Sequence, residues 1–226
     1  MPFATWKALC IDATDLIRLA GFWAAVLGRS PADGDGESIQ LAGERDDDVI
    51  WLNAVPEPKS VKHRVHLDVQ VGDLDGLRDL GAAVVRPPGD DRSWWVMADV
   101  EGGEFCAFVR DGRPSLPGRL YEVVVDCADP FQQAEWWGRV LGLDVEKGPR
   151  SASLDGRGTL PFDYLCLVPV PEPKAAKNRV HWDVDTADVA SLVAAGARIL
   201  RTPDDIFWHI MADPEGNEFC AFTATT

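Results

Sequence analysis

The sequence VPEPKSVKHRVHLDV at residues 55–69 occurs again as VPEPKAAKNRVHWDV at residues 170–184, and 11 of the 15 positions are identical. A second sequence, MADVEGGEFCAF at residues 97–108, occurs again as MADPEGNEFCAF at residues 211–222, with 10 of 12 positions identical. Both pairs keep the same order and the same offset to within one residue. Solenoid and propeller repeats are shorter, about 20–50 residues. The chain therefore contains two copies of a larger unit, each the size of a small domain.

The repeats set the expected domain boundaries. We expect a first domain at residues 1–110, a linker at residues 111–120 and a second domain at residues 121–226. The linker sequence DGRPSLPGRL contains two prolines and two glycines, which interrupt regular secondary structure.

Composition limits the class of protein. Of the 226 residues, 46% are hydrophobic, which is enough for a core in each unit. The net charge of −15 argues against a nucleic-acid partner, because such partners require clustered basic residues. The five cysteines lie mostly in apolar segments, which indicates reduced thiols in a cytoplasmic protein. No segment approaches the roughly 20 apolar residues that span a bilayer, so we expect no membrane partner.

Each unit begins with a strand followed by a helix. Apolar segments typical of strands at Ala8–Ala13 and Glu122–Cys127 precede amphipathic segments at Leu16–Leu27 and Phe131–Leu141. An aspartate precedes each helix and a glycine follows it, as in capped helices. Further strands and one short helix complete each unit.

Two module counts fit this order of elements. Each unit is either two half-length modules or one βαβββ module with an additional short helix. About 50 residues is short for a module with its own core, so length favours the second interpretation. The sequence therefore predicts an α+β fold with two tandem βαβββ modules.

Alternation along the strands predicts a polar face in each unit. Successive side chains of a strand point to opposite faces, and charged residues here alternate with large apolar ones. We expect helices to cover the apolar faces and the polar faces to line clefts. The polar faces carry His66, Glu104 and Cys106 in the first unit and His181, Glu218 and Cys220 in the second.

The nine tryptophans exceed what two small cores require. Those that face a cleft would form a flat aromatic wall for a planar or cationic ligand. We select Trp51, Trp94 and Trp208 for this role.

Three motifs together resemble the vicinal oxygen chelate superfamily, and its glyoxalase-like branch in particular. They are Asp-x-x-Asp before a helix that ends in Leu-Gly, then Arg-Val-His-x-Asp-Val, then Asp-Pro-Glu-Gly-Asn-Glu-Phe-Cys. The second unit is the better match, because the first has Val100 and Gly103 where the motif has proline and asparagine. The resemblance covers nearly the whole chain twice, and implies curved mixed sheets that enclose clefts.

The resemblance also implies positions for a divalent metal in such a cleft. They fall on Ala8 and Glu122 in the first strands, on His66 and His181, and on Cys106 and Cys220 where relatives have a carboxylate. The missing carboxylates argue against a hard metal such as Mg²⁺, so we expect no cofactor. If the modules exchange first strands, His66, Cys106 and Glu122 would meet in one cleft and could bind Zn²⁺.

Other roles for these residues stay open. The cysteines can be buried structural residues, with the histidines hydrogen-bonded to neighbours such as Asp68 and Asp183, or a Cys/His pair can act as a nucleophile. Glu104 and Glu218 are candidates for a lone general base, or they are rim carboxylates that pair with arginines. The local basic cluster, Lys59, Lys62 and Arg64 with Lys174, Lys177 and Arg179, can bind an anionic group of a ligand or pair with neighbouring glutamates.

We expect a glyoxalase-like protein that binds a small organic molecule in an aromatic-lined cleft. Sequestration, as in the bleomycin-resistance relatives, is the first hypothesis, because metal ligands are missing. The alternative is a metal-dependent lyase, isomerase or dioxygenase. The sequence leaves open whether the chain is a monomer with internally paired modules or a homodimer.

Overall fold

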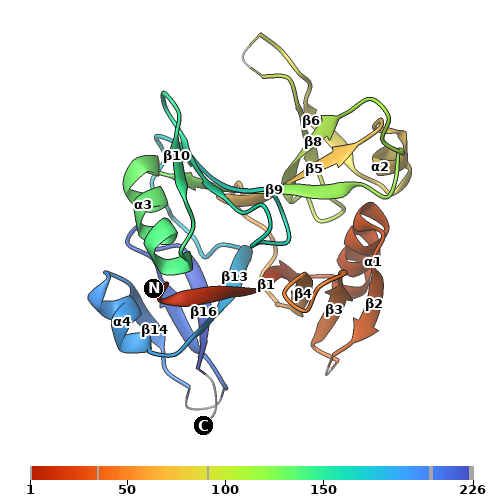
Figure 1. Ribbon diagram of the computed structural model, residues 1–226. Coiled ribbons are helices and arrows are strands. Elements are labelled where there is room, and N and C mark those ends of the chain that lie inside the picture. The colour runs from red at the N-terminus through yellow and green to blue at the C-terminus, as the bar shows by residue number, and fades with distance from the viewer. Residues whose placement is uncertain (1, 35, 91, 204–205, 224–226) are drawn as a thin grey trace.

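The computed structural model describes residues 2–34, 36–90, 92–203 and 206–223 (Figure 1). The elements of the first repeat are β1 Ala4–Ala13, α1 Leu16–Leu27, β2 Ser30–Asp33, β3 Ser38–Ala42, β4 Val49–Ala54, β5 Val65–Val71, α2 Asp75–Asp79, β6 Ala83–Arg86, β7 Trp95–Ala98 and β8 Glu104–Val109. Those of the second repeat are β9 Arg119–Cys127, α3 Pro130–Leu141, β10 Val145–Lys147, β11 Ala152–Asp155, β12 Tyr164–Pro169, β13 Val180–Thr186, α4 Val189–Ala194, β14 Arg198–Arg201, β15 His209–Ala212 and β16 Glu218–Thr223.

The expected α+β fold with mixed sheets is confirmed, but each repeat contains a second module. The order β-α-β-β-β occurs four times in the described chain, starting at β1, β5, β9 and β13. The length argument for a single module in each repeat was therefore wrong. A module of about 50 residues needs no core of its own when its sheet continues into another module.

Each sheet combines one module from each repeat. Sheet A has the order β14-β15-β16-β13-β1-β4-β3-β2, and sheet B has the order β10-β11-β12-β9-β5-β8-β7-β6. The modules meet at antiparallel pairs, β1 with β13 and β5 with β9. Figure 1 shows this exchange, with the red β1 beside the blue β13. Strand β9 begins inside the stretch that we expected to be a linker.

The long helices α1 and α3 start and end at the residues that the sequence indicates. The Asp15 carboxylate accepts a hydrogen bond from a backbone N–H in the first turn of α1, and Asp129 does the same for α3. Gly28 and Gly142 end the helices with φ of 65° and 69°, a left-handed conformation that glycine adopts without strain.

These two helices also hold the sheets together. Helix α1 belongs to a module of sheet A, but its Trp23 packs edge-on against Phe105 of sheet B, with ring centroids 5.3 Å apart. Helix α3 belongs to a module of sheet B, and its Trp137 packs against Trp182 and Phe219 of sheet A at 4.8 and 5.2 Å. The buried residues therefore form one core that both repeats share.

The repeated turn at residues 97–108 and 211–222 makes a second connection between the sheets. Glu101, in the turn before β8, accepts a hydrogen bond of 3.0 Å from the backbone N–H of Thr14 in the other sheet. Glu215 accepts bonds of 2.7 Å from the backbone N–H groups of Ala128 and Asp129. A carboxylate at this place also interacts favourably with the N-terminal end of the helix that follows. No helix in the described residues is long and apolar enough to cross a membrane.

Candidate functional site

The polar face of sheet B lines a cavity of about 550 Å³. Its walls come from both repeats, since β5 and β8 lie beside β9, β11 and β12. The titratable side chains that line it include His66, Asp68, Cys106, Tyr121, Glu122 and Cys166. The structure thus brings His66, Cys106 and Glu122 to one cavity through the exchange of modules.

His66, Asp68 and Cys106 form the centre of this cavity. Each offers one ligand atom, and these atoms lie within 4.8 Å of one another. The His66 Nδ1 and the Asp68 Oδ1 are 2.9 Å apart, which is a hydrogen bond. Burial lowers the pKa of His66, but the Asp68 carboxylate outweighs this effect and leaves the pKa raised. The imidazole therefore takes up a proton more readily than a free histidine.

Glu122 lies on β9, the strand that pairs with β5. It is the register partner of Asp68 in the β5–β9 ladder. Burial, followed by the negative charge of Asp68, raises the pKa of Glu122 to about 7. A carboxyl group with this pKa can both accept and donate a proton near neutral pH.

An aromatic wall closes one side of the cavity. Trp94 stacks on Phe108 with centroids 5.5 Å apart and an interplanar angle of 21°. Phe108 in turn meets the edge of Tyr121 at 5.7 Å. All three residues line the cavity, so a flat ligand would find an aromatic surface there.

Two candidate residues lie away from this cavity, which corrects their expected position. The Glu104 carboxylate binds the Lys59 Nζ at 3.0 Å and the backbone N–H of His63 at 3.0 Å. In the second repeat, Glu218 binds the Lys174 Nζ at 2.7 Å in the same way. Both glutamates have the expected strand parity, but they stand at the first residue of their strands. There they hold the loops that precede β5 and β13, and neither is a lone base facing a ligand.

Sheet A presents different residues at the equivalent positions. Ala8 replaces Glu122, and the indole of Trp51 replaces Cys166 beside the first strand. Trp208 stacks on Phe222 at 5.3 Å, as Trp94 stacks on Phe108. The remaining candidates, His181 and Cys220, also belong to this sheet.

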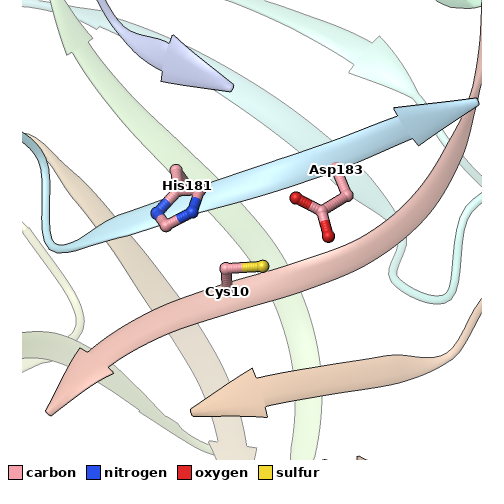
Figure 2. Close-up of side chains that lie close together, drawn as sticks. All are labelled: Cys10, His181 and Asp183. Atoms are coloured by element: carbon pink, nitrogen blue, oxygen red, sulfur yellow. The ribbon is translucent and has the colours of Figure 1, made fainter. Parts of the chain in front are cut away.

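A compact cluster of Cys10, His181 and Asp183 lies on the same sheet (Figure 2). Its ligand atoms lie within 4.8 Å of one another. Burial lowers the pKa of His181 to about 4 and raises the pKa of Asp183 to about 6. At neutral pH the histidine is therefore neutral and the aspartate is largely ionised.

The thiols of both sheets are poor nucleophiles. Burial raises the pKa of Cys106, and the charge of Asp68 raises it further. Burial and Asp183 have the same effect on the pKa of Cys220. Because the thiolate is the reactive form, a Cys/His nucleophile does not fit this geometry.

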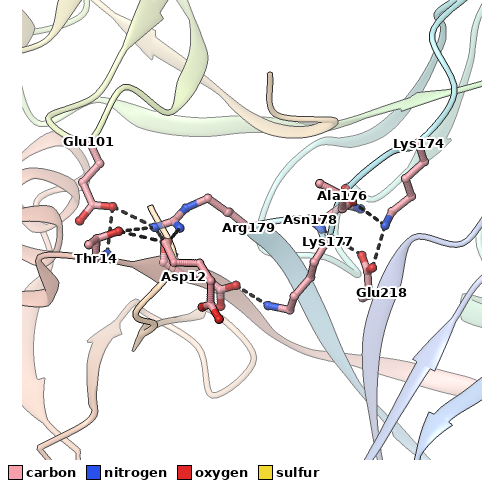
Figure 3. A network of polar contacts seen from close by, with 10 residues as sticks. Asp12, Thr14, Glu101, Lys174, Ala176, Lys177, Asn178, Arg179 and Glu218 are labelled. Atoms are coloured by element: carbon pink, nitrogen blue, oxygen red, sulfur yellow. Dashed lines mark hydrogen bonds and ion pairs between the residues drawn. The ribbon is translucent and has the colours of Figure 1, made fainter. Parts of the chain in front are cut away.

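The basic cluster is occupied by protein groups (Figure 3). The two loops at residues 55–64 and 170–179 face each other across a cavity of about 770 Å³. Lys177 binds Asp12 across this junction, and Lys62 binds Asp126. Arg179 donates to the backbone oxygen of Glu57 at 2.6 Å. These cations join the repeats, which explains why the most closely repeated sequence is polar.

Sequence reasoning placed Asp68 and Asp183 on the same strand face as their histidines, and the expected hydrogen bond forms between His66 and Asp68. It did not select Cys10 or Cys166. The position of Cys10 opposite His181 depends on the β1–β13 register, and that of Cys166 near Glu122 on the β9–β12 register. Neither register can be read from a single strand.

Comparison with known proteins gives one family. The family described as "Glyoxalase-like domain" matches residues 8–108 and again residues 122–222. Among solved structures, a glyoxalase I mutant from Zea mays superposes with a TM-score of 0.68 at 15% identity, covering 98% of this chain and 94% of that one. A putative dioxygenase from Bacillus subtilis superposes with a TM-score of 0.67 at 11% identity, covering 100% and 86%. A search of curated proteins finds no match.

Proposed function

Because the chain belongs to the glyoxalase-like domain family of the vicinal oxygen chelate superfamily, we propose that it binds a small organic molecule in the cavity of sheet B and sequesters it. The observation that carries this proposal is the aromatic wall of Trp94, Phe108 and Tyr121 in a cavity of about 550 Å³. Cavities that hold small ligands range over about 300–1,000 Å³ and combine apolar walls with a few polar groups.

The charge of the cavity favours a planar, cationic ligand. Asp68, Glu122, Asp126 and Glu146 line it, and among the described residues of its wall Lys147 is the one lysine. The Lys147 Nζ is engaged by the carboxylate of Glu135 at 2.6 Å. Aromatic faces attract cations as well as flat rings, so the wall and the carboxylates select the same chemical class. The net charge of −15 would add attraction at longer range.

The test compares equivalent tryptophans of the two sheets. Planar organic cations and uncharged molecules of the same shape are titrated into the protein by calorimetry. We expect cations to bind, Trp94→Ala to weaken binding about tenfold or more, and Trp208→Ala to leave it unchanged. Equal loss in the two variants, or a preference for uncharged molecules, would contradict the proposal.

A metal-dependent lyase, isomerase or dioxygenase is the second candidate. The observation in its favour is the cluster of His66, Asp68 and Cys106 with Glu122 opposite. One imidazole, one thiol and one carboxylate suit Zn²⁺ better than Mg²⁺, so these residues fit such an ion chemically. A zinc ion held there would polarise a substrate oxygen, and Glu122 would transfer a proton.

Metal content separates the two candidates. If the second is correct, Cys106→Ala lowers the zinc content of the purified protein by one ion per chain, and Cys127→Ala leaves it unchanged. If the protein sequesters a cation without chemistry, ligand binding persists after Cys106→Ala. Cys127 is a suitable control because its buried thiol lies outside both clusters and donates to a backbone oxygen.

A further inference from the structure

Sheet A contains a second cluster of potential ligands that differs from the one in sheet B. Cys10 on β1 is the register partner of His181 on β13, and Ala8 is the partner of Asp183. The exposed fractions of Cys10, His181 and Asp183 are 4%, 8% and 6%. Figure 2 shows the three side chains pointing toward one another between the two strands. An imidazole, a thiol and a carboxylate are thus gathered at a buried place.

Two polar atoms of this cluster have no partner among the described residues. They are the Nδ1 of His181 and the Oδ1 of Asp183, and both are buried. A buried polar atom without a hydrogen bond costs about 1–3 kcal/mol. In sheet B the equivalent atoms of His66 and Asp68 bind each other at 2.9 Å. The same two residue types therefore satisfy one another in sheet B and are left unsatisfied in sheet A.

At the position of Cys10 the two sheets also carry different residues. The equivalent position on β9 is Val124, which lines the cavity of sheet B and has no ligand atom. On β1 the thiol of Cys10 lies in the same group as the imidazole and the carboxylate. Cys220 also interacts with Asp183, but its thiol lies outside this group of three ligand atoms.

We propose that Cys10, His181 and Asp183 bind one zinc ion. Nitrogen, sulfur and oxygen donors suit Zn²⁺, while Mg²⁺ and Ca²⁺ take oxygen ligands. The ion would give the two unsatisfied atoms their partner, and Cys10 would release its thiol proton to solvent on binding. Because β1 belongs to the first repeat and β13 to the second, this zinc ion would join the repeats.

The site is structural in character and independent of ligand binding in sheet B. Its residues come from the centre of sheet A, where Trp51 lies beside Cys10 in place of the smaller Cys166. The three ligands come from the paired strands β1 and β13, so the ion would stabilise the pairing of these strands. The expected consequence of zinc is therefore a higher melting temperature.

The experiment uses the full chain, stripped of metal with a chelator and titrated with Zn²⁺ or with Co²⁺ as a spectroscopic probe. We expect a thiolate-to-cobalt absorption band in the near ultraviolet and a rise in Tm with Zn²⁺. Cys10→Val introduces the residue found at the equivalent position of sheet B, so the variant should fold. It should lose the band and bind about 10–100-fold more weakly or worse. Cys127→Ala, which introduces the alanine found at the equivalent position Ala13, should behave as the wild type.

Asp183→Asn provides a second variant that keeps the size of the side chain. It should weaken zinc binding while the cobalt band of the Cys10 thiolate remains at saturating metal. The proposal is overturned if the folded chain takes up no metal. It is also overturned if Cys106→Ala abolishes the band and Cys10→Val does not, because the ion would then lie in sheet B.

Discussion

Glu122 and Ala8 occupy equivalent positions, and this single difference changes the electrostatics of the two clefts. Glu122 places a second carboxyl group beside Asp68, while Ala8 leaves Asp183 without an acidic neighbour on β1. Two nearby carboxylates repel each other when both are ionised, so one of them keeps its proton to higher pH. The raised pKa of Glu122, about 7, is the result of its burial and of this repulsion.

The raised pKa predicts a dependence of stability on pH. The folded state binds the proton of Glu122 more tightly than the unfolded state, so the stability from this group is fully present below the unfolded pKa of 4.5. It is lost as the pH rises through about 7. We expect Glu122→Gln to be more stable than the wild type at pH 8 by about 1–2 kcal/mol, allowing for the partial exposure of the carboxyl group. Near pH 4 the two proteins should unfold at the same urea concentration.

Urea unfolding at the two pH values checks this prediction. The exposed Glu44→Gln serves as the control, because it removes a charge of the same sign away from the cavity. A Glu122→Gln variant that is less stable at pH 8 would show that the ionised carboxylate makes a favourable contact.

At the scale of elements, the repeats show a pair of compensating differences. In the second repeat, the Asn178 Nδ2 donates to the Asn217 Oδ1 at 3.1 Å. In the first repeat these positions hold His63 and Gly103. A Cβ added to Gly103 would lie 2.6 Å from the Asp99 Oδ2 and 2.7 Å from the His63 Cε1, so the carboxylate and the imidazole together occupy the space of the missing side chain. The two loops therefore reach the same conformation with different pairs of residues.

This compensation predicts that the effects of two substitutions on the free energy of unfolding are not additive. Gly103→Asn alone should destabilise the protein by about 1–3 kcal/mol, because the new side chain overlaps the buried imidazole of His63 and the carboxylate of Asp99. His63→Asn with Gly103→Asn recreates the pair of the second repeat and should recover most of that loss. A double-mutant cycle from denaturant unfolding measures the coupling, and strict additivity of the two changes would refute the explanation.

The elements also show how far the sequence alone can predict this fold and its site. Helix ends follow from Asp129 and Gly142, and strand faces follow from alternation, because both depend on local chemistry. The number of modules depends on pairing between strands far apart in the chain, and the length of one segment does not contain that information. Glu104 has the role that one alternative gave it, a carboxylate paired with a cation, but its partner is Lys59 and not an arginine, which depends on the position of another loop.

At the scale of the whole molecule, the contacts between the repeats follow an approximate two-fold symmetry. Arg64 donates to the backbone oxygens of Glu172 and Asp126 in the other repeat. Arg179 makes the equivalent bonds to the backbone oxygens of Glu57 and Asp12. Such reciprocal contacts are typical of the interface of a symmetric homodimer. Here the interface lies within one chain, and each sheet is completed without a second molecule.

This symmetry predicts how half of the chain would behave. Residues 1–114 contain β1 to β8, but these strands form only the β1–β4 half of sheet A and the β5–β8 half of sheet B. In one copy the apolar faces of both halves would be exposed, at a cost of about 1.5–3 kcal/mol for each large side chain. Two copies can restore both sheets, since β5 of one copy can take the place of β13 beside β1 of the other. Light scattering should therefore give a dimer for this fragment and a monomer of 24.7 kDa for the full chain. A fragment that unfolds cooperatively as a monomer would contradict the prediction, because its sheets would then not need the second repeat.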